Sequence, residues 1–271
     1  MVSSKLNYFA ICRLPDELSG NQIVLDHMKK LTLLALIALV ACKTNPTAQE
    51  VTDSAIKNSG VKKLENATAS FTFRGIQYDY KLRNGNYRYT RTQFDSVQNE
   101  IKDVLVNSGL NRFVNDSLVE IEDKKRAAYA ASVNSVIYFA FLPLSLNDAA
   151  VNKMYVGKVD MNEKTYHKIK VTFNAEGGGE DFEDIFFYWF DEEDYSLDYL
   201  AYSYNEDHGK GVRFREAYNV REVNDVVIQD YNNYKPKKED GFVLEHIDEA
   251  FLNGELELLS KIELDEVAIS L

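Results

Sequence analysis

Residues 76–91 read IQYDYKLRNGNYRYTR, and this stretch decides the fold class. On both sides of Asn84-Gly85, large apolar residues alternate with polar ones. An alternation with a period of two is typical of a strand that buries one face. An Asn-Gly pair between two such runs is the strongest short-range signal of a β-hairpin. The stretch therefore predicts two antiparallel strands joined by a tight turn.

Similar short runs recur along most of the chain. Further strands are predicted at residues 71–73, 101–106, 112–121, 155–159, 166–173, 185–190, 199–204, 213–220 and 226–231. Their close spacing leaves little room for crossover helices, so we expect an antiparallel meander, mainly β with helical additions (α+β). The chain has 271 residues, of which 45% are apolar, and residues 51–271 are predicted to form one domain.

One segment, residues 122–141, breaks the β pattern and predicts a helix. One side of this helix is formed by Ala127, Ala131, Ser135 and Tyr138. Larger apolar residues fill the other side, so the helix is expected to be largely buried, and Leu142-Pro143 ends it because proline cannot continue a helix. The helix could be a core element packed on a sheet, a lid over a concave sheet that admits a ligand, or both.

The stretch IFFYWF, residues 185–190, is apolar on both faces of a strand. One face can line a cavity while the other packs against another element; a strand buried without any ligand is the alternative. With the helix at 122–141, this strand supplies the candidate ligand-binding residues Val136, Ile137, Phe186, Tyr188, Trp189 and Phe190. Arg74, Arg88 and Arg91 could bind a carboxylate or phosphate group, or could be solvated or ion-paired.

The C-terminal stretch, residues 242–271, mixes apolar and acidic residues at helical and then irregular spacing. It could cover an open sheet edge, which exposed edge strands usually need. Alternatively, it could dock a partner.

A targeting signal precedes the predicted domain, at residues 28–41. Two lysines are followed by an apolar run over residues 31–40, which is too short to span about 30 Å of hydrocarbon and is typical of a signal peptide. Residues 39–42 read LVAC and resemble a lipobox, with cleavage after Ala41 and lipidation of Cys42. Acyl chains such as palmitate on Cys42 would anchor the protein stably.

The segments on either side of this signal differ in character. Residues 1–27 fit a signal peptide poorly because they carry acidic side chains; they are either a genuine extension or the result of a start assigned upstream of Met28, and we favour the second interpretation. Residues 42–50 form a polar, lipidated tether, followed by a short helix around residues 51–58. The net charge of −12 argues against nucleic acid and against a domain that lies flat on anionic lipid.

A resemblance supports this architecture. It rests on three groups of residues: 132–139 with Leu142-Pro143, the run YWFD at residues 188–191, and Arg213-Phe214 followed by Asn219 and Asp230-Tyr231. The chain resembles a family of uncharacterised lipoproteins from bacteroidete-type bacteria, and its hairpins are similar to those of the lipoprotein-carrier (LolA/LolB-like) fold. That fold is an antiparallel half-open β-barrel with helices over its concave face. Proline often follows the aspartate in such hairpins, whereas here Glu192 follows it.

The resemblance implies a function of binding rather than catalysis. We expect a lipid-anchored outer-membrane protein that binds or carries an acyl chain or another hydrophobic ligand in its concavity. Lys43, rather than aspartate, follows the lipidated cysteine, so the outer membrane is the default location. The alternative is a structural adaptor subunit of an outer-membrane or surface complex. The sequence does not identify protein partners.

Enzyme and metal motifs are not found in the sequence. The 4 histidines lie far apart, so no catalytic, metal or cofactor site is predicted. Residues 177–181, GGGED, could be a calcium loop but lack EF-hand spacing, so a flexible acidic hairpin is preferred. An aldolase of the deoxyribose-phosphate type, a label carried by some relatives, would need a βα barrel and a Schiff-base lysine. The sequence supports neither.

Short Asp-Ser-aliphatic motifs resemble an O-glycosylation signal of these bacteria. They occur at residues 53–55, 95–97 and 116–118. Ser54 and Ser117 are the candidate acceptors, and Ser54 is the better one because it lies near the tether.

Replacing Cys42 with alanine should abolish lipidation, because the cysteine sulfur is the only nucleophilic side-chain atom in the motif LVAC. The measurement is the intact mass of the processed protein, with and without the signal peptidase II inhibitor globomycin. Processing that ignores globomycin, with no acyl mass on the parent protein, would contradict the lipobox assignment.

Overall fold

The computed structural model describes residues 45–177, 182–206, 209–238 and 241–271. The expected signal peptide, Cys42 and residues 1–27 lie outside these ranges. All the helices and strands described belong to one compact unit, Pro46–Leu271. Within the described ranges, no helix combines the length and the apolar character that crossing a membrane requires.

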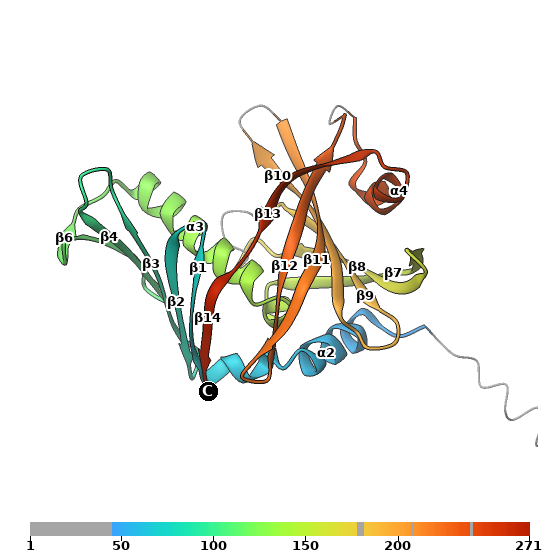
Figure 1. Cartoon of the computed structure of the whole chain (residues 1–271), viewed down its shortest axis with the longest axis horizontal. Helices are drawn as coiled ribbons and strands as arrows, with labels where there is room; N and C mark the ends of the chain where they lie inside the picture. The colour runs from blue at the N-terminus through green and yellow to red at the C-terminus, as the bar shows by residue number, and fades with distance from the viewer. Residues whose placement is uncertain (1–44, 178–181, 207–208, 239–240) are drawn as a thin grey trace, which may run out of the picture. The chain divides into compact units, whose positions relative to one another are not determined.

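Two antiparallel sheets of seven strands each make up this unit (Figure 1). The first sheet, in the order β14-β1-β2-β3-β4-β5-β6, consists of β1 (Thr68–Phe73), β2 (Ile76–Arg83), β3 (Asn86–Phe94), β4 (Glu100–Val106), β5 (Gly109–Val114), β6 (Ser117–Val119) and β14 (Asp265–Ser270). The second, in the order β13-β12-β11-β10-β9-β8-β7, consists of β7 (Val151–Met161), β8 (Lys164–Phe173), β9 (Ile185–Asp191), β10 (Leu197–Glu206), β11 (Gly209–Val223), β12 (Val226–Pro236) and β13 (Leu256–Ile262). Among the described residues neither sheet closes on itself, so the predicted antiparallel, half-open architecture is confirmed.

Tight turns with two consecutive residues at positive φ join several of these hairpins. The predicted turn at Asn84-Gly85 has φ angles of 50° and 75°. The pairs Asn115-Asp116, Asn162-Glu163 and Asn224-Asp225 have φ angles from 47° to 69° in the same arrangement, which is that of the type I′ turn. The single strand predicted at residues 112–121 was therefore wrong, because the pair at 115–116 folds it into β5 and β6.

The C-terminal segment adds the edge strand of both sheets. β13 pairs with β12, and after two residues the chain enters the other sheet, where β14 pairs with β1. Figure 1 shows the two strands as one continuous path between the sheets. Helical spacing in this stretch is accounted for by the turn η3 (Leu244–His246) and the short helix α4 (Ile247–Leu252) that precede β13.

A buried carboxylate fixes the bend between β13 and β14. Asp230 on β12 accepts a hydrogen bond from the Leu264 backbone N–H at 3.0 Å and from the Asn219 amide at 2.6 Å. It also pairs with Arg221 at 3.1 Å, and Arg221 donates to the Leu264 carbonyl at 2.6 Å. One ion pair thus holds both backbone polar groups of the residue at which the chain leaves one sheet for the other.

At the N-terminal end, α2 (Ala48–Asn58) begins earlier than predicted. Thr47 accepts from the Glu50 N–H at 3.1 Å, while the Glu50 carboxylate accepts from the Thr47 N–H at 2.8 Å. This reciprocal capping satisfies N–H groups that a helix start leaves open, so residues 48–50 of the expected tether are helical. Gly60, at φ +70°, follows; a Cβ there would lie 2.1 Å from the Asp225 carbonyl oxygen, so glycine allows η1 (Val61–Asn66) to approach the β11–β12 turn.

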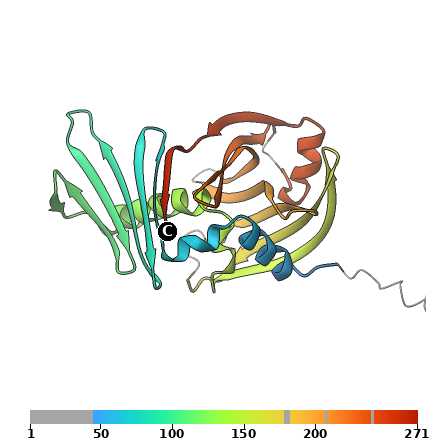
Figure 2. The same cartoon turned by 60° about the horizontal axis from the view of Figure 1, so that its bottom comes forward.

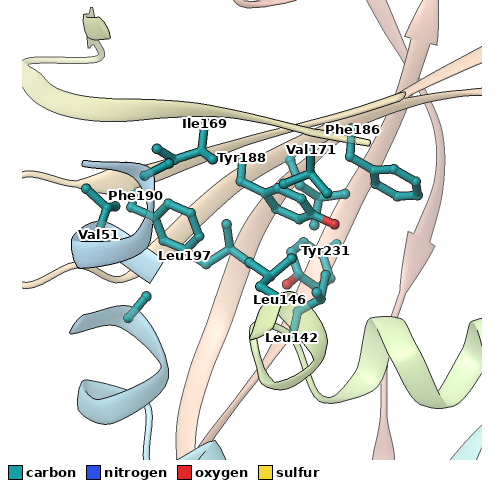
Figure 3. Close-up of a cluster of buried hydrophobic side chains, with 13 residues drawn as sticks. Val51, Leu142, Leu146, Ile169, Val171, Phe186, Tyr188, Phe190, Leu197 and Tyr231 are labelled. Carbon is teal, nitrogen blue, oxygen red and sulfur yellow. The ribbon is translucent and has the colours of Figure 1, made fainter. Parts of the chain in front are cut away.

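Packed cores lie on both faces of the second sheet. On one face, α2 and the turn η2 (Leu144–Asn147) cover an aromatic layer, with Val51, Leu142 and Leu146 against Tyr188 and Phe190 (Figure 3). On the other face, Phe187, Trp189 and Phe214 pack under η3 and α4, around Leu244, Ile247 and Phe251. The stretch at residues 185–190 therefore packs on both sides.

The helix α3 (Asp123–Ala140) runs from the first sheet to the second (Figures 1 and 2). Its first half lies beside β3, β4 and β5, and near its end Tyr138 and Phe139 contact Phe186 of β9. Of its 18 residues, Val133 and Ile137 are buried. The prediction of a largely buried helix was wrong, because its alanine-rich side faces a cavity instead of packed side chains.

Replacing Asp230 with alanine should lower the free energy of unfolding by about 2–3 kcal/mol, because Arg221 and the buried Leu264 N–H lose their acceptor. Urea denaturation measures the loss, and hydrogen exchange should show that β14 amides lose protection before those of β9.

The matched control is Glu257→Ala on β13, which removes a half-exposed ion pair with Lys235. Such pairs contribute about 1 kcal/mol or less. Equal destabilisation by both substitutions, or unchanged protection of β14, would contradict the role of Asp230.

Candidate functional site

A cavity of about 810 Å³ lies between α3 and the two sheets. This volume is within the range of small-molecule sites, about 300–1,000 Å³. Its walls include Phe73, Tyr87 and Leu105 of the first sheet, Phe173, Phe186, Tyr202, Tyr204, Arg215, Gln229 and Tyr231 of the second, and Ile262 and Leu264 at the bend. The cavity therefore exists only because the bend and α3 bring the sheets together.

Small side chains of α3 make the space. The side of the helix predicted from spacing, which is formed by Ala127, Ala131, Ser135 and Tyr138, lines the cavity, together with Ala130 and Asn134. Alanine side chains stop one carbon from the backbone, so this wall cannot fill the gap between helix and sheet. The other side of the helix packs Val133 and Ile137 into cores, so α3 is a core element that also covers the cavity.

The wall formed by the second sheet is aromatic. Phe186 stacks on Tyr202 with ring centroids 5.3 Å apart, and Phe139 from α3 lies 5.2 Å from the same Tyr202 ring. Phe173 meets Phe186 edge-on at 5.6 Å. Contiguous aromatic rings present a large apolar surface with little conformational freedom, which suits contact with an apolar ligand.

Tyrosine hydroxyl groups next to the cavity are satisfied internally. Tyr138 and Tyr188 share a hydrogen bond at 2.8 Å, and the Gln229 amide donates to Tyr231 at 2.6 Å. Burial raises the pKa of Tyr138 and Tyr188 and brings that of Tyr231 to about 12, so all three stay protonated at neutral pH. These groups stabilise the packing between α3 and the sheet without adding charge.

One buried cation lines the cavity. Arg215 of β11 is 7% exposed, and its guanidinium lies 3.9 Å from the centre of the Phe139 ring. Its Nη2 donates to the Tyr202 hydroxyl at 2.8 Å, while Nε and Nη1 have no hydrogen-bond partner within the described residues. Sequence analysis missed this residue because alternation along β11 does not say which face is enclosed.

The structure separates the six predicted ligand-binding residues. Val136 and Phe186 line the cavity, and Tyr188 reaches it only through its bond to Tyr138. Ile137 and Phe190 belong to packed cores. The assignment of Trp189 was wrong: it lies on the opposite face of β9, where its indole donates to Asp248 at 3.2 Å, because neighbouring residues of a strand point to opposite faces.

The arginines proposed to bind an anion do not line this cavity. Arg74 and Arg88 are exposed, and Arg91 pairs with Asp103, which is fully buried, at 2.6 Å. Arg112 holds the other carboxylate oxygen at 2.7 Å.

The same ion-paired cluster anchors the first half of α3. Arg91 donates to the Ser132 hydroxyl at 2.8 Å, and Arg112 lies 3.6 Å from the centre of the Tyr129 ring. Ser132 and Tyr129 belong to α3, so these contacts hold the helix against the first sheet.

The remaining predicted sites are placed as follows. Ser54 lies within α2 and donates to the Glu50 carbonyl at 2.8 Å, and Ser117 is exposed at the start of β6. The acidic loop at residues 178–181 lies outside the described residues. In the part of the chain that is described, no group of three or more histidine, cysteine or acidic side chains is arranged to hold a metal ion.

Replacing Asp103 with asparagine should cost about 3–5 kcal/mol at pH 7, because it leaves two arginines without a carboxylate in a buried site. Burial acts to raise the pKa of Asp103, but hydrogen bonds from Arg112 and Arg91 outweigh it and hold the pKa below its ordinary value. The stabilisation is therefore complete above about pH 4 and is lost as the pH falls further.

Urea denaturation between pH 7 and pH 2 tests this. The difference between parent and variant should shrink in acid. Asp116→Asn, at an exposed turn, is the matched control and should change stability by less than about 0.5 kcal/mol. A pH-independent difference would contradict the ion-paired assignment.

Comparison with known proteins places the chain in a family. No curated protein sequence matches it. Among solved structures it is similar to a LolA superfamily protein from Nitrosomonas europaea (7% identity, TM-score 0.45, 83% of this chain and 92% of that chain covered). It is also similar to an outer membrane lipoprotein-sorting protein domain from Vibrio parahaemolyticus (6%, 0.40, 76% and 99%) and to a DUF1329 family protein from Desulfovibrio piger (10%, 0.39, 77% and 100%). A family model matches residues 29–263, so the chain belongs to the family of unknown function DUF6503.

Proposed function

We propose that this protein binds or carries a hydrophobic ligand, such as an acyl chain, in the cavity under α3. The observation that carries the proposal is the cavity itself, about 810 Å³, with aromatic rings on one wall and alanine side chains on the other. Apolar surface that is poorly hydrated favours an apolar occupant without requiring many directional contacts.

The proposed location follows from the sequence. Lipid on Cys42 would hold the folded unit at the outer membrane through residues 43–46, since the capped helix α2 begins at Ala48. A lipid anchor would place the cavity within reach of membrane lipids. A net charge of −12 is compatible with a domain kept off the anionic surface.

Filling the cavity tests this function. The mature chain, residues 42–271, produced without lipid, should carry bound lipid in native mass spectrometry and should take up a fluorescent fatty acid. Ala131→Trp places a large ring in the cavity and should weaken uptake at least about tenfold, because the ligand and the ring compete for one volume.

Ala128→Trp is the matched control, since Ala128 lies on the same helix but is exposed and does not line the cavity. It should bind like the parent. Failure of the parent to bind any lipid or fatty acid, together with a co-purifying protein, would replace the carrier function with that of a structural adaptor. Equal effects of the two tryptophans would place the ligand elsewhere.

A further inference from the structure

We propose that Arg215 is the head-group subsite of the cavity and selects an anionic amphiphile, one whose carboxylate or phosphate head meets the guanidinium while its chain occupies the aromatic part. This inference rests on the proposed function and specifies its ligand class.

The first argument is the state of the guanidinium. Arg215 is 7% exposed, yet Nε and Nη1 have no hydrogen-bond partner within the described residues. A buried donor without an acceptor destabilises the folded state, and more so when it is charged. Groups that violate this rule in a native protein are concentrated at functional sites, and an acceptor from a ligand would satisfy both nitrogens.

The second argument is a contrast with four other cations that are buried or half-buried in the described part of the chain. Arg91 and Arg112 share Asp103, Arg221 pairs with Asp230, and Lys168 pairs with Asp248 at 2.7 Å. No carboxylate in the described part of the chain forms an ion pair with Arg215. The missing partner is thus an anion, and the cavity is the space from which it can come.

The third argument is the setting of the guanidinium. It lies against the ring of Phe139, 3.9 Å from its centre, while the Tyr202 hydroxyl accepts from Nη2. These contacts fix its orientation and leave the other two nitrogens available. Across the β11–β12 pair, Arg215 faces Asn233, whose side-chain Oδ1 is also buried without a partner.

The chemistry of the cavity sets the ligand class. Asp184, half-buried on the β8–β9 hairpin, is the other charged side chain among the described lining residues. Apolar and aromatic groups make up most of the remaining wall. A single guanidinium in such surroundings interacts with an anionic oxygen more strongly than it would in water, because the low dielectric strengthens charge-assisted hydrogen bonds.

Chain-matched ligands test the proposal. Palmitate, hexadecyl phosphate and hexadecanol share one alkyl chain and differ in the head, so titration of the unlipidated mature chain measures head-group preference directly. The parent should bind the two anions at least tenfold more tightly than the alcohol. Arg215→Gln should lose that preference and keep the alcohol affinity within about twofold. Inorganic phosphate alone should not compete, because the alkyl chain supplies much of the binding.

Two further variants complete the design. Arg215→Lys retains a charge but loses the planar fork, so it should keep part of the preference. Arg88→Gln removes an exposed arginine that does not line the cavity and should behave as the parent.

Equal affinity of the parent for all three ligands, or an unchanged preference in Arg215→Gln, would overturn the proposal and leave the carrier function standing. If Arg215→Gln loses all binding, the lysine variant decides: a retained anion preference supports the subsite, and a lost one overturns it. A parent that binds none of the three would instead remove the proposed function.

Discussion

The bend between β13 and β14 is the constraint on which the rest of this fold depends. Antiparallel sheets bury one face against another layer, and here one chain segment supplies an edge strand to each sheet. Asp230 accepts from the Leu264 N–H, and Arg221 donates to the Leu264 carbonyl. Without them both backbone groups would be buried and unpaired where the chain passes from one sheet to the other. Because the bend sets the placement of the two sheets, it also sets the width of the space that α3 spans.

The helix α3 turns that space into a cavity. It is anchored at one end by the Asp103 cluster on the first sheet and at the other by Tyr138 on the second. Val133 and Ile137 are buried in packed cores on one side of the helix, while alanines on the other side line the cavity. The cavity is therefore a property of one helical face.

Charge is distributed unevenly over the interior. The buried carboxylates Asp103, Asp230 and Asp248 each have a cationic partner, and each holds a structural junction: α3 to the first sheet, the bend, and α4 to the outer face. Burying a charge is tolerable when it is paired and hydrogen-bonded. Within the described residues Arg215 has no such partner and lies at the cavity wall, which is why we propose a binding role for it rather than a structural one.

The sequence by itself determined the local features: the antiparallel strands, the turn at Asn84-Gly85, the helix over residues 122–141 and its alanine side, and membership of an uncharacterised family. Periodicity is a local property and identifies which residues share a face. Only the tertiary structure decided which face is enclosed. Trp189 therefore bonds to Asp248 of α4, Arg91 pairs with Asp103, and Arg215 lines the cavity. The pairing of β1 with β14 joins the first strand of the folded unit to its last strand. Spacing along the chain carries no signal for such a contact, because it depends on how distant strands pack in space.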